Sequence, residues 1–131
     1  MRSSLYAAAI ASVAASHGAI AAGSAGEEGV HLVTMTGLDV PIVEGDRAEG
    51  RLRLKIVLRA ADEAGAARLT DSMPLLRETA LATTSEFARL YASPYAPVDA
   101  RRLAADLHAA LHAQDPGLQS VLLVEVSALR V

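Results

Sequence analysis

The sequence contains no cysteine and no tryptophan, and only one of its 131 residues is phenylalanine. Without cysteine the chain cannot form disulfides, use a thiol nucleophile or bind a metal through thiolates. With so few aromatic rings, a stacking platform for bases or sugars is not expected. The 12 basic residues against 15 acidic ones give a formal net charge of -3, whereas nucleic-acid-binding domains normally have a basic surplus. The length allows one domain.

The short motifs that mark common active sites are also missing. No Gly-x-Ser-x-Gly sequence surrounds a serine, and no glycine-rich loop leads into Lys-Ser or Lys-Thr. Glu125 is a carboxylate within an apolar segment, and we expect it to face the solvated side. No residue is predicted to be catalytic or to bind a cofactor, so we expect a protein that is not an enzyme.

His108 and His112 are spaced four residues apart, so on a helix both could face one metal ion. No glutamate follows His108, and the zinc-protease helix motif is therefore absent. Helical spacing places both at the flank of a leucine stripe or beyond it. We interpret them as a surface pair and predict no metal site.

Residues 1–21 have the organisation of a secretory signal peptide. Arg2 supplies an early positive charge, an uncharged and mostly apolar segment runs from Leu5 to Ala15, and Ala19-Ile20-Ala21 suits a signal peptidase. The alternative is an uncleaved anchor from about Leu5 to Ala25, which has the length to span a bilayer but is rich in alanine instead of leucine. We expect the rest of the chain to be exported, either free after cleavage or held at a membrane by the uncleaved anchor.

Residues 22–29 are small and polar without periodicity, which is typical of a flexible tether. The domain is expected over residues 30–131. It begins with a β-favouring segment at 30–36 and a second strand at 38–44, which Pro41 restricts to a sheet edge or an irregular strand. A loop is expected at 45–50.

Residues 51–59 alternate between aliphatic and mostly basic side chains. This alternation predicts a strand with one buried face and one solvated face. The solvated face carries a basic stripe, which we define as Arg51, Arg53, Lys55 and Arg59.

Two interpretations of this basic stripe remain open. It could contact an anionic lipid, a phosphate or an acidic partner, or it could guard a solvated strand against aggregation. Glu44, Asp46 and Glu49 of the preceding loop could neutralise part of it. The basic stripe and the edge near Pro41 are the contact surfaces that we expect.

Three helices are expected after these strands. Asp62 can cap the first, which runs to about Asp71. The second starts at Ser72 or at the Met73-Pro74 step and ends at Ser93-Pro94, and Asp99 opens the third. One face of the second helix is expected in the core and carries Met73, Leu76, Ala80, Phe87, Leu90 and Tyr91. The third helix has a narrow apolar stripe of Ala100, Leu103, Leu107 and Leu111.

The last strand is expected over residues 118–131. Its segment 121–126 is almost entirely apolar, which suits a strand that is buried on both sides. The predicted fold is α+β, a small and mainly antiparallel sheet with helices packed on one face, in the order β-β-β-α-α-α-β.

Several segments together carry a family resemblance. They are Leu38-Asp-Val-Pro-Ile-Val43, the alternating residues 51–59, Leu69-Thr-Asp-Ser-Met-Pro-Leu-Leu-Arg-Glu-Thr-Ala-Leu81, the leucines 103, 107 and 111, and the valine-rich residues 121–126. In order and pattern this part of the chain, residues 38–131, resembles the flagellar basal-body-associated FliL family.

The resemblance implies a periplasmic domain similar to stomatin-like domains, which is expected either soluble after signal-peptide cleavage or tethered to the inner membrane. It also implies a protein that assembles into rings, supports the stator units of the flagellar motor and has no catalytic activity. We therefore expect a non-enzymatic envelope scaffold with protein partners, such as stator or basal-body components, that forms a homo-oligomer. No nucleic acid or cofactor is expected, and membrane contact is expected only through an uncleaved N-terminal segment. The alternative is a soluble periplasmic binding or accessory module with an unrelated partner.

Overall fold

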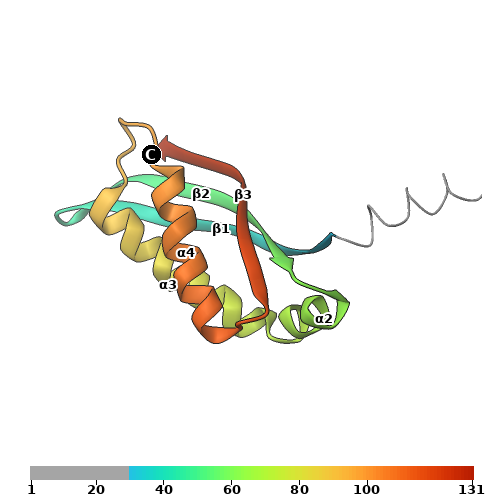
Figure 1. Cartoon of the computed structure of the whole chain (residues 1–131). Coiled ribbons are helices and arrows are strands. Elements are labelled where there is room, and N and C mark those ends of the chain that lie inside the picture. Colours follow the sequence, from blue (N-terminus) through green and yellow to red (C-terminus); the bar gives the residue numbers. More distant parts are fainter. Residues whose placement is uncertain (1–29) are drawn as a thin grey trace, which may run out of the picture.

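The computed structural model describes residues 30–131, so the expected signal peptide or anchor at 1–21 and the tether at 22–29 lie outside the described residues. Two strands come first, three helices follow, and a strand ends the domain (Figure 1). The α+β class is confirmed. The elements are β1 (His31–Glu44), β2 (Arg47–Ala60), α2 (Glu63–Asp71), α3 (Met73–Tyr91), α4 (Ala100–Gln114) and β3 (Leu118–Arg130).

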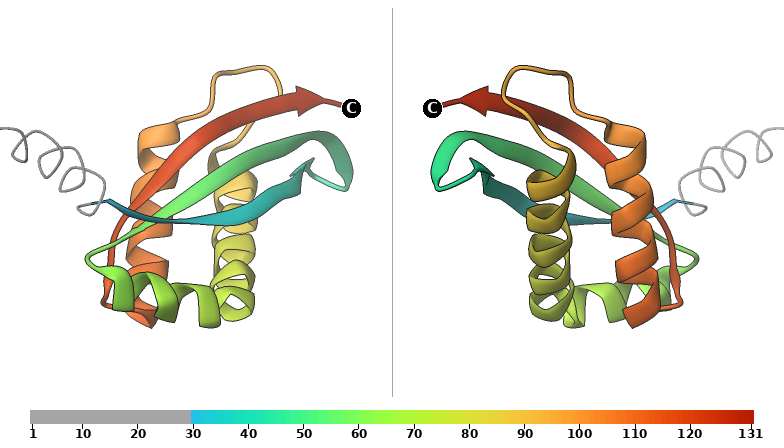
Figure 2. Two further views of the ribbon diagram at one scale, coloured as in Figure 1. Left: turned by 90° about the vertical axis from the view of Figure 1, so that its right-hand side faces the viewer. Right: turned by 90° about the vertical axis from the view of Figure 1, so that its left-hand side faces the viewer.

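The sheet has the strand order β1-β2-β3, and both pairs are antiparallel. Helices α3 and α4 run along one side of the sheet, and α2 lies across their lower ends (Figure 2). No described helix covers the opposite side, which we call the open face. Because β1 and β3 run in the same direction, the described chain enters at one end of the sheet and leaves at the other.

Strand β1 corrects the expected strand count. The predicted strands at 30–36 and 38–44 are one strand, whose register with β2 shifts between Met35 and Leu38 and again between Ile42 and Val43. Gly37 therefore lies in an irregularity of a continuous strand, which is a common role of glycine within a strand. The element order is β-β-α-α-α-β, and β1 is an edge strand, as the proline at position 41 predicted.

The expected loop at 45–50 is also shorter in the structure. Glu44 pairs directly with Arg47, so Gly45 and Asp46 alone form the turn. Gly45 has a φ of 66°, a backbone conformation that glycine adopts without steric cost. Residues 48–50 belong to β2, so the hairpin is tighter than the two flanking glycines suggested.

The helix boundaries follow the predicted signals. The Asp62 carboxylate accepts a hydrogen bond of 2.6 Å from the backbone N–H of Gly65 and caps α2. The Asp99 carboxylate accepts one of 3.1 Å from the backbone N–H of Arg102 and caps α4. Each cap satisfies a backbone donor that has no partner within its helix.

The core lies between the sheet and the helices. The inward side chains of β2 and the three leucines of α4 are essentially inaccessible. Leu90 and Tyr91, expected in the core, are 49% and 46% exposed. They occupy the last turn of α3, where the helical pattern continues but the core has ended. Thr84, which the apolar pattern passed over, is fully buried instead.

Strand β3 is not buried on both sides as expected. Val124 is 65% exposed, and Leu122 and Leu129 are 41% and 40% exposed. The reason is topological: β3 is an edge strand, and the helices cover only one of its two faces. Its apolar side chains therefore extend onto the open face.

Gly50 provides a test of how closely the sheet packs against the loop before α4. A Cβ at this position would collide with the Leu129 carbonyl oxygen and lie 2.9 Å from the Pro94 Cβ. We expect Gly50→Ala to lower the free energy of unfolding by about 1–3 kcal/mol, because β3 and the loop must move apart. Urea unfolding monitored by circular dichroism measures the change.

The matched control for this prediction is Gly37→Ala. A Cβ there meets the Leu54 carbonyl oxygen at 3.6 Å, an ordinary van der Waals contact. Equal unfolding midpoints for the two variants would contradict the close packing at Gly50.

Candidate functional site

Strand β2 presents the predicted basic stripe on the open face, because its aliphatic side chains occupy the core. The side chains of Arg51, Arg53 and Lys55 are 45%, 55% and 66% exposed. Arg59 is partly buried, and Val57 separates it from the other three. The stripe is thus a cluster of three cations and one isolated arginine.

Each of the three clustered cations contacts a carboxylate on a neighbouring strand. The Nε atoms of Arg51 and Arg53 lie 2.5 Å and 3.1 Å from the two carboxylate oxygens of Asp39 on β1. Lys55 Nζ lies 2.9 Å from Glu125 on β3. These pairs cross both ladders of the sheet. Three cations against two carboxylates leave one positive charge on the cluster.

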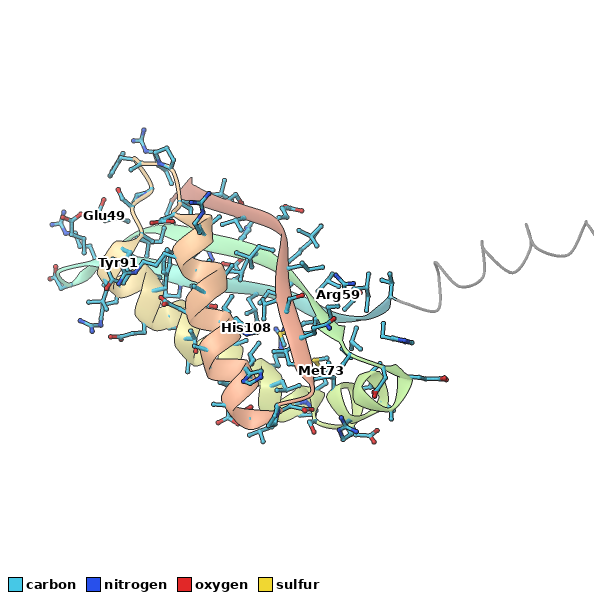
Figure 3. The ribbon with its side chains drawn as sticks, viewed as in Figure 1. Glu49, Arg59, Met73, Tyr91 and His108 are labelled. Carbon is cyan, nitrogen blue, oxygen red and sulfur yellow. The ribbon has the colours of Figure 1, made fainter. Side chains whose placement is uncertain are left out.

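The carboxylates in and beside the hairpin turn do not neutralise the basic stripe, although the sequence allowed that role. Within residues 30–131, none of Glu44, Asp46 and Glu49 forms an ion pair with the basic stripe. Glu49 instead accepts a hydrogen bond of 3.3 Å from the Tyr95 hydroxyl. It lies toward the opposite end of the sheet from Arg59 (Figure 3). The neutralising residues, Asp39 and Glu125, lie beside the stripe because of strand register, which the sequence does not display.

The two arginines lower the pKa of the Asp39 carboxyl group. The hydrogen bond from Arg51 is the largest cause that holds the Asp39 pKa below its usual 3.8, and Arg53 acts in the same direction. Desolvation opposes both. Asp39 therefore stays ionised to a lower pH than an isolated aspartate.

The other end of the open face is apolar. Val57 of β2 lies there between Thr34 of β1 and Leu122 of β3, and Leu32 is 50% exposed nearby. A shallow hollow of about 290 Å³ crosses this region, between the register shift of β1 at Gly37 and that of β3 at Val124. Its lining includes Thr34, Thr36, Gly37, Lys55, Val57 and Val124. Sequence analysis missed this patch because it assigned both faces of β3 to the core.

Arg59 is the cation nearest to this apolar end. Its position on β2 pairs with Leu32 of β1 and Ser120 of β3. Its Nε is buried and has no hydrogen-bond partner among the described residues. Arg59 therefore differs from the three clustered cations, because no carboxylate in residues 30–131 fixes it in place.

The remaining candidates from the sequence lie apart from this face or play another part in it. The rings of His108 and His112 on α4 have centroids 5.4 Å apart, but no cluster of three or more possible metal ligands occurs in residues 30–131. Glu125 faces the solvated side, as expected, and pairs with Lys55.

A second surface, not found from the sequence, lies between α3 and α4. The guanidinium of Arg102 stacks 3.8 Å from the centre of the Tyr91 ring and donates a 2.6 Å hydrogen bond to the Tyr91 hydroxyl. A hollow of about 430 Å³ beside this pair includes Glu86, Leu90 and Asp106 in its lining. Stacking with Arg102 explains how Tyr91 is held while nearly half of it stays exposed.

Comparisons of the chain with protein-family models, with curated proteins and with solved structures find no match. The FliL resemblance therefore depends on the sequence segments named above. Of the helices in residues 30–131, none combines the length and apolar character needed to cross a bilayer.

Replacement of Asp39 tests the charge cluster. Because folding lowers the Asp39 pKa, its ionised form stabilises the fold above the usual pKa of 3.8, and this contribution is lost as the pH falls through the lowered pKa. We expect Asp39→Asn to be slightly less stable than the parent at about pH 6, and the difference to vanish as the pH falls through the lowered pKa. The effect is small because the group is exposed to solvent.

The measurement is the urea midpoint of both proteins across this pH range at low salt. Glu44→Gln is the control, since it also removes one negative charge from β1 but breaks no ion pair among the described residues. If the urea midpoints of the parent and of Asp39→Asn fell by the same amount as the pH is lowered, the stabilising role of Asp39 would be contradicted.

Proposed function

We propose that this chain is a non-enzymatic scaffold of the cell envelope, resembling FliL, that supports flagellar motor and stator function by self-association and protein contacts. The observation that carries the proposal is the open face. One whole side of the sheet is left uncovered by the described helices, and it combines a charge cluster with an apolar end. An exposed apolar patch rimmed by polar groups is typical of a protein contact surface.

The order of elements also supports the proposal. An alternating strand leads through a short capped helix into α3, whose first turn contains Pro74. The leucine-rich α4 and a final valine-rich strand follow. This is the order that the FliL resemblance implies for residues 38–131.

The charges on the open face suit a protein partner. Arg51, Arg53 and Lys55 keep about half or more of their side-chain surface exposed while their carboxylate partners restrict their positions. Cations that are fixed before binding lose less side-chain entropy on contact. These three residues are the proposed partner contacts, and Arg59 extends the surface toward the apolar end.

A soluble periplasmic binding or accessory module is the second candidate function. It is favoured by the position of the first strand, since β1 begins at His31. Cleavage after Ala21 or Ala22 would therefore leave every described element intact. In that case the open face would bind a partner unrelated to the motor.

Deletion of the gene tests the motor role. We expect the deletion to reduce swimming in viscous medium, and the parent chain to restore it. Lys55→Glu should fail to restore it, because this substitution places a second carboxylate beside Glu125 on the open face. Arg101→Glu on α4 is the control with the same change in charge, and it should restore swimming. Normal swimming of the deletion strain would remove the motor role.

The mature N-terminus distinguishes the two candidate functions. Mass spectrometry of the tagged chain from separated membrane and periplasmic fractions gives the first residue. For the anchored scaffold we expect a chain that starts at Met1 or Arg2 in the membrane fraction. A chain that starts near Ala22 in the soluble fraction would instead support the accessory module.

A further inference from the structure

The two edges of the sheet differ in how far they are closed to another strand. On β1, Pro41 has no backbone N–H to donate. Arg77 of α3 donates hydrogen bonds of 2.5 Å and 3.2 Å to the carbonyl oxygens of Thr36 and Gly37. Two register shifts further interrupt this strand. Proline, irregularities and covering side chains are the means by which proteins protect edge strands, and β1 uses all three.

The edge of β3 lacks most of this protection. Its thirteen residues contain no proline, and Glu125 and Arg130 are its only charged residues. The Glu125 carboxylate is already paired with Lys55 inside the domain. Its register with β2 shifts twice, beside Val124 and between Ser120 and Leu118, but the segment from Glu125 to Arg130 pairs with β2 without interruption.

The register of β3 identifies the backbone groups on its free edge. The N–H of Val131 donates to the carbonyl oxygen of Glu49 on β2 at 3.3 Å, so residue 131 faces β2. Because successive residues of a strand direct their N–H and C=O groups to opposite sides, residues 126, 128 and 130 face away from the sheet. No side chain of the described residues donates to these groups.

The side chains along this edge are apolar. Leu122, Val124 and Leu129 are each at least 40% exposed on the open face. A long edge strand with exposed apolar side chains is a site where another strand adds.

We propose that a second copy of this chain pairs antiparallel with β3 about a twofold axis near Ser127, which joins the two sheets into one of six strands. The proposal names the contact for the self-association in the proposed function and rests on that function. In this register residue 126 of one copy faces residue 128 of the other, so their free backbone groups bond to each other. Glu125 faces Leu129 of the second copy, and no like charges are opposed.

The same geometry explains why the partner is a second copy. A strand of identical sequence supplies free donors and acceptors at matching intervals on both sides of the twofold axis. The pairing also places the two open faces on the same side of the six-stranded sheet. Stable specific interfaces bury at least about 1,200 Å² in total, and a contact between residues 124–130 of two edge strands is small on this scale, so the dimer should be weak and depend on concentration.

Single cysteines test the contact directly, because the chain has none of its own. Ser127→Cys places two thiols across the axis with Cα atoms about 4.5 Å apart, within the range of a disulfide. We expect mild oxidation of the full chain to give a linked dimer on non-reducing gels. Val43→Cys on β1, which is 42% exposed, is the control and should run as an unlinked monomer on the same gels.

A charge on the edge provides a second readout that does not require a disulfide. We expect Val124→Lys to raise the dimer dissociation constant by tenfold or more in analytical ultracentrifugation, because it places two ammonium groups near one interface. Leu75→Lys on α3, at a position 55% exposed, is the control and should leave the constant unchanged.

Equal linking of the Ser127→Cys and Val43→Cys variants, or no linking and a monomeric parent at every concentration, would overturn the β3 contact. These outcomes are separate from the swimming assay. If the protein is monomeric and deletion of its gene impairs swimming, the scaffold role stands and this interface is wrong. A β3 dimer whose deletion leaves swimming normal would keep the interface and remove the motor role.

Discussion

Strand β2 pairs along both of its edges, and its alternation constrains every other element. Its inward side chains, Leu52, Leu54, Ile56 and Leu58, are at most 2% exposed and form the base on which the helices pack. A shift of one residue would turn these aliphatic groups to solvent and bury the cations. The cost of burying unpaired cations is large, so the register of both neighbouring strands is strongly specified. The ion pairs to Asp39 and Glu125 follow from that register.

Elements whose signals are local could be predicted from the sequence. The alternation of β2 lies within nine residues, and the helix starts are marked by Asp62, the Met73-Pro74 step and Asp99. The neighbouring sequence could not show whether Gly37 ends a strand or lies in a bulge of a continuous strand, because glycine occurs in both places. Pairing with β2 decides between the two. The burial of β3 depended on its place in the sheet. An apolar segment has the same sequence pattern in a central strand, which is buried on both faces, and in an edge strand that buries only one face. The pattern alone therefore does not predict the burial of β3.

In the candidate site, too, local features could be predicted from the sequence and long-range contacts could not. The four cations of the basic stripe and their common face were evident from their spacing. Their carboxylate partners were not, because Asp39 is 12 residues from Arg51 along the chain and Glu125 is far beyond the helices. Long-range register alone brings them together. The apolar end of the open face was missed for the same reason, since Leu32, Val57 and Leu122 come from three different strands.

The parallel course of β1 and β3 has a mechanical consequence. His31 lies opposite Ala60 at one end of the sheet, and Arg130 lies opposite Gly50 at the other, which is roughly 33 Å away along β2 at 3.3 Å per residue. A pull applied between these two points acts along the strands. The hydrogen bonds of each ladder then share the load in shear, instead of opening one after another as they do when a hairpin is unzipped. A domain that is held at its N-terminal side and pulled at its C-terminal side would therefore resist extension. The force would pass through the β1-β2 ladder and then through the β2-β3 ladder.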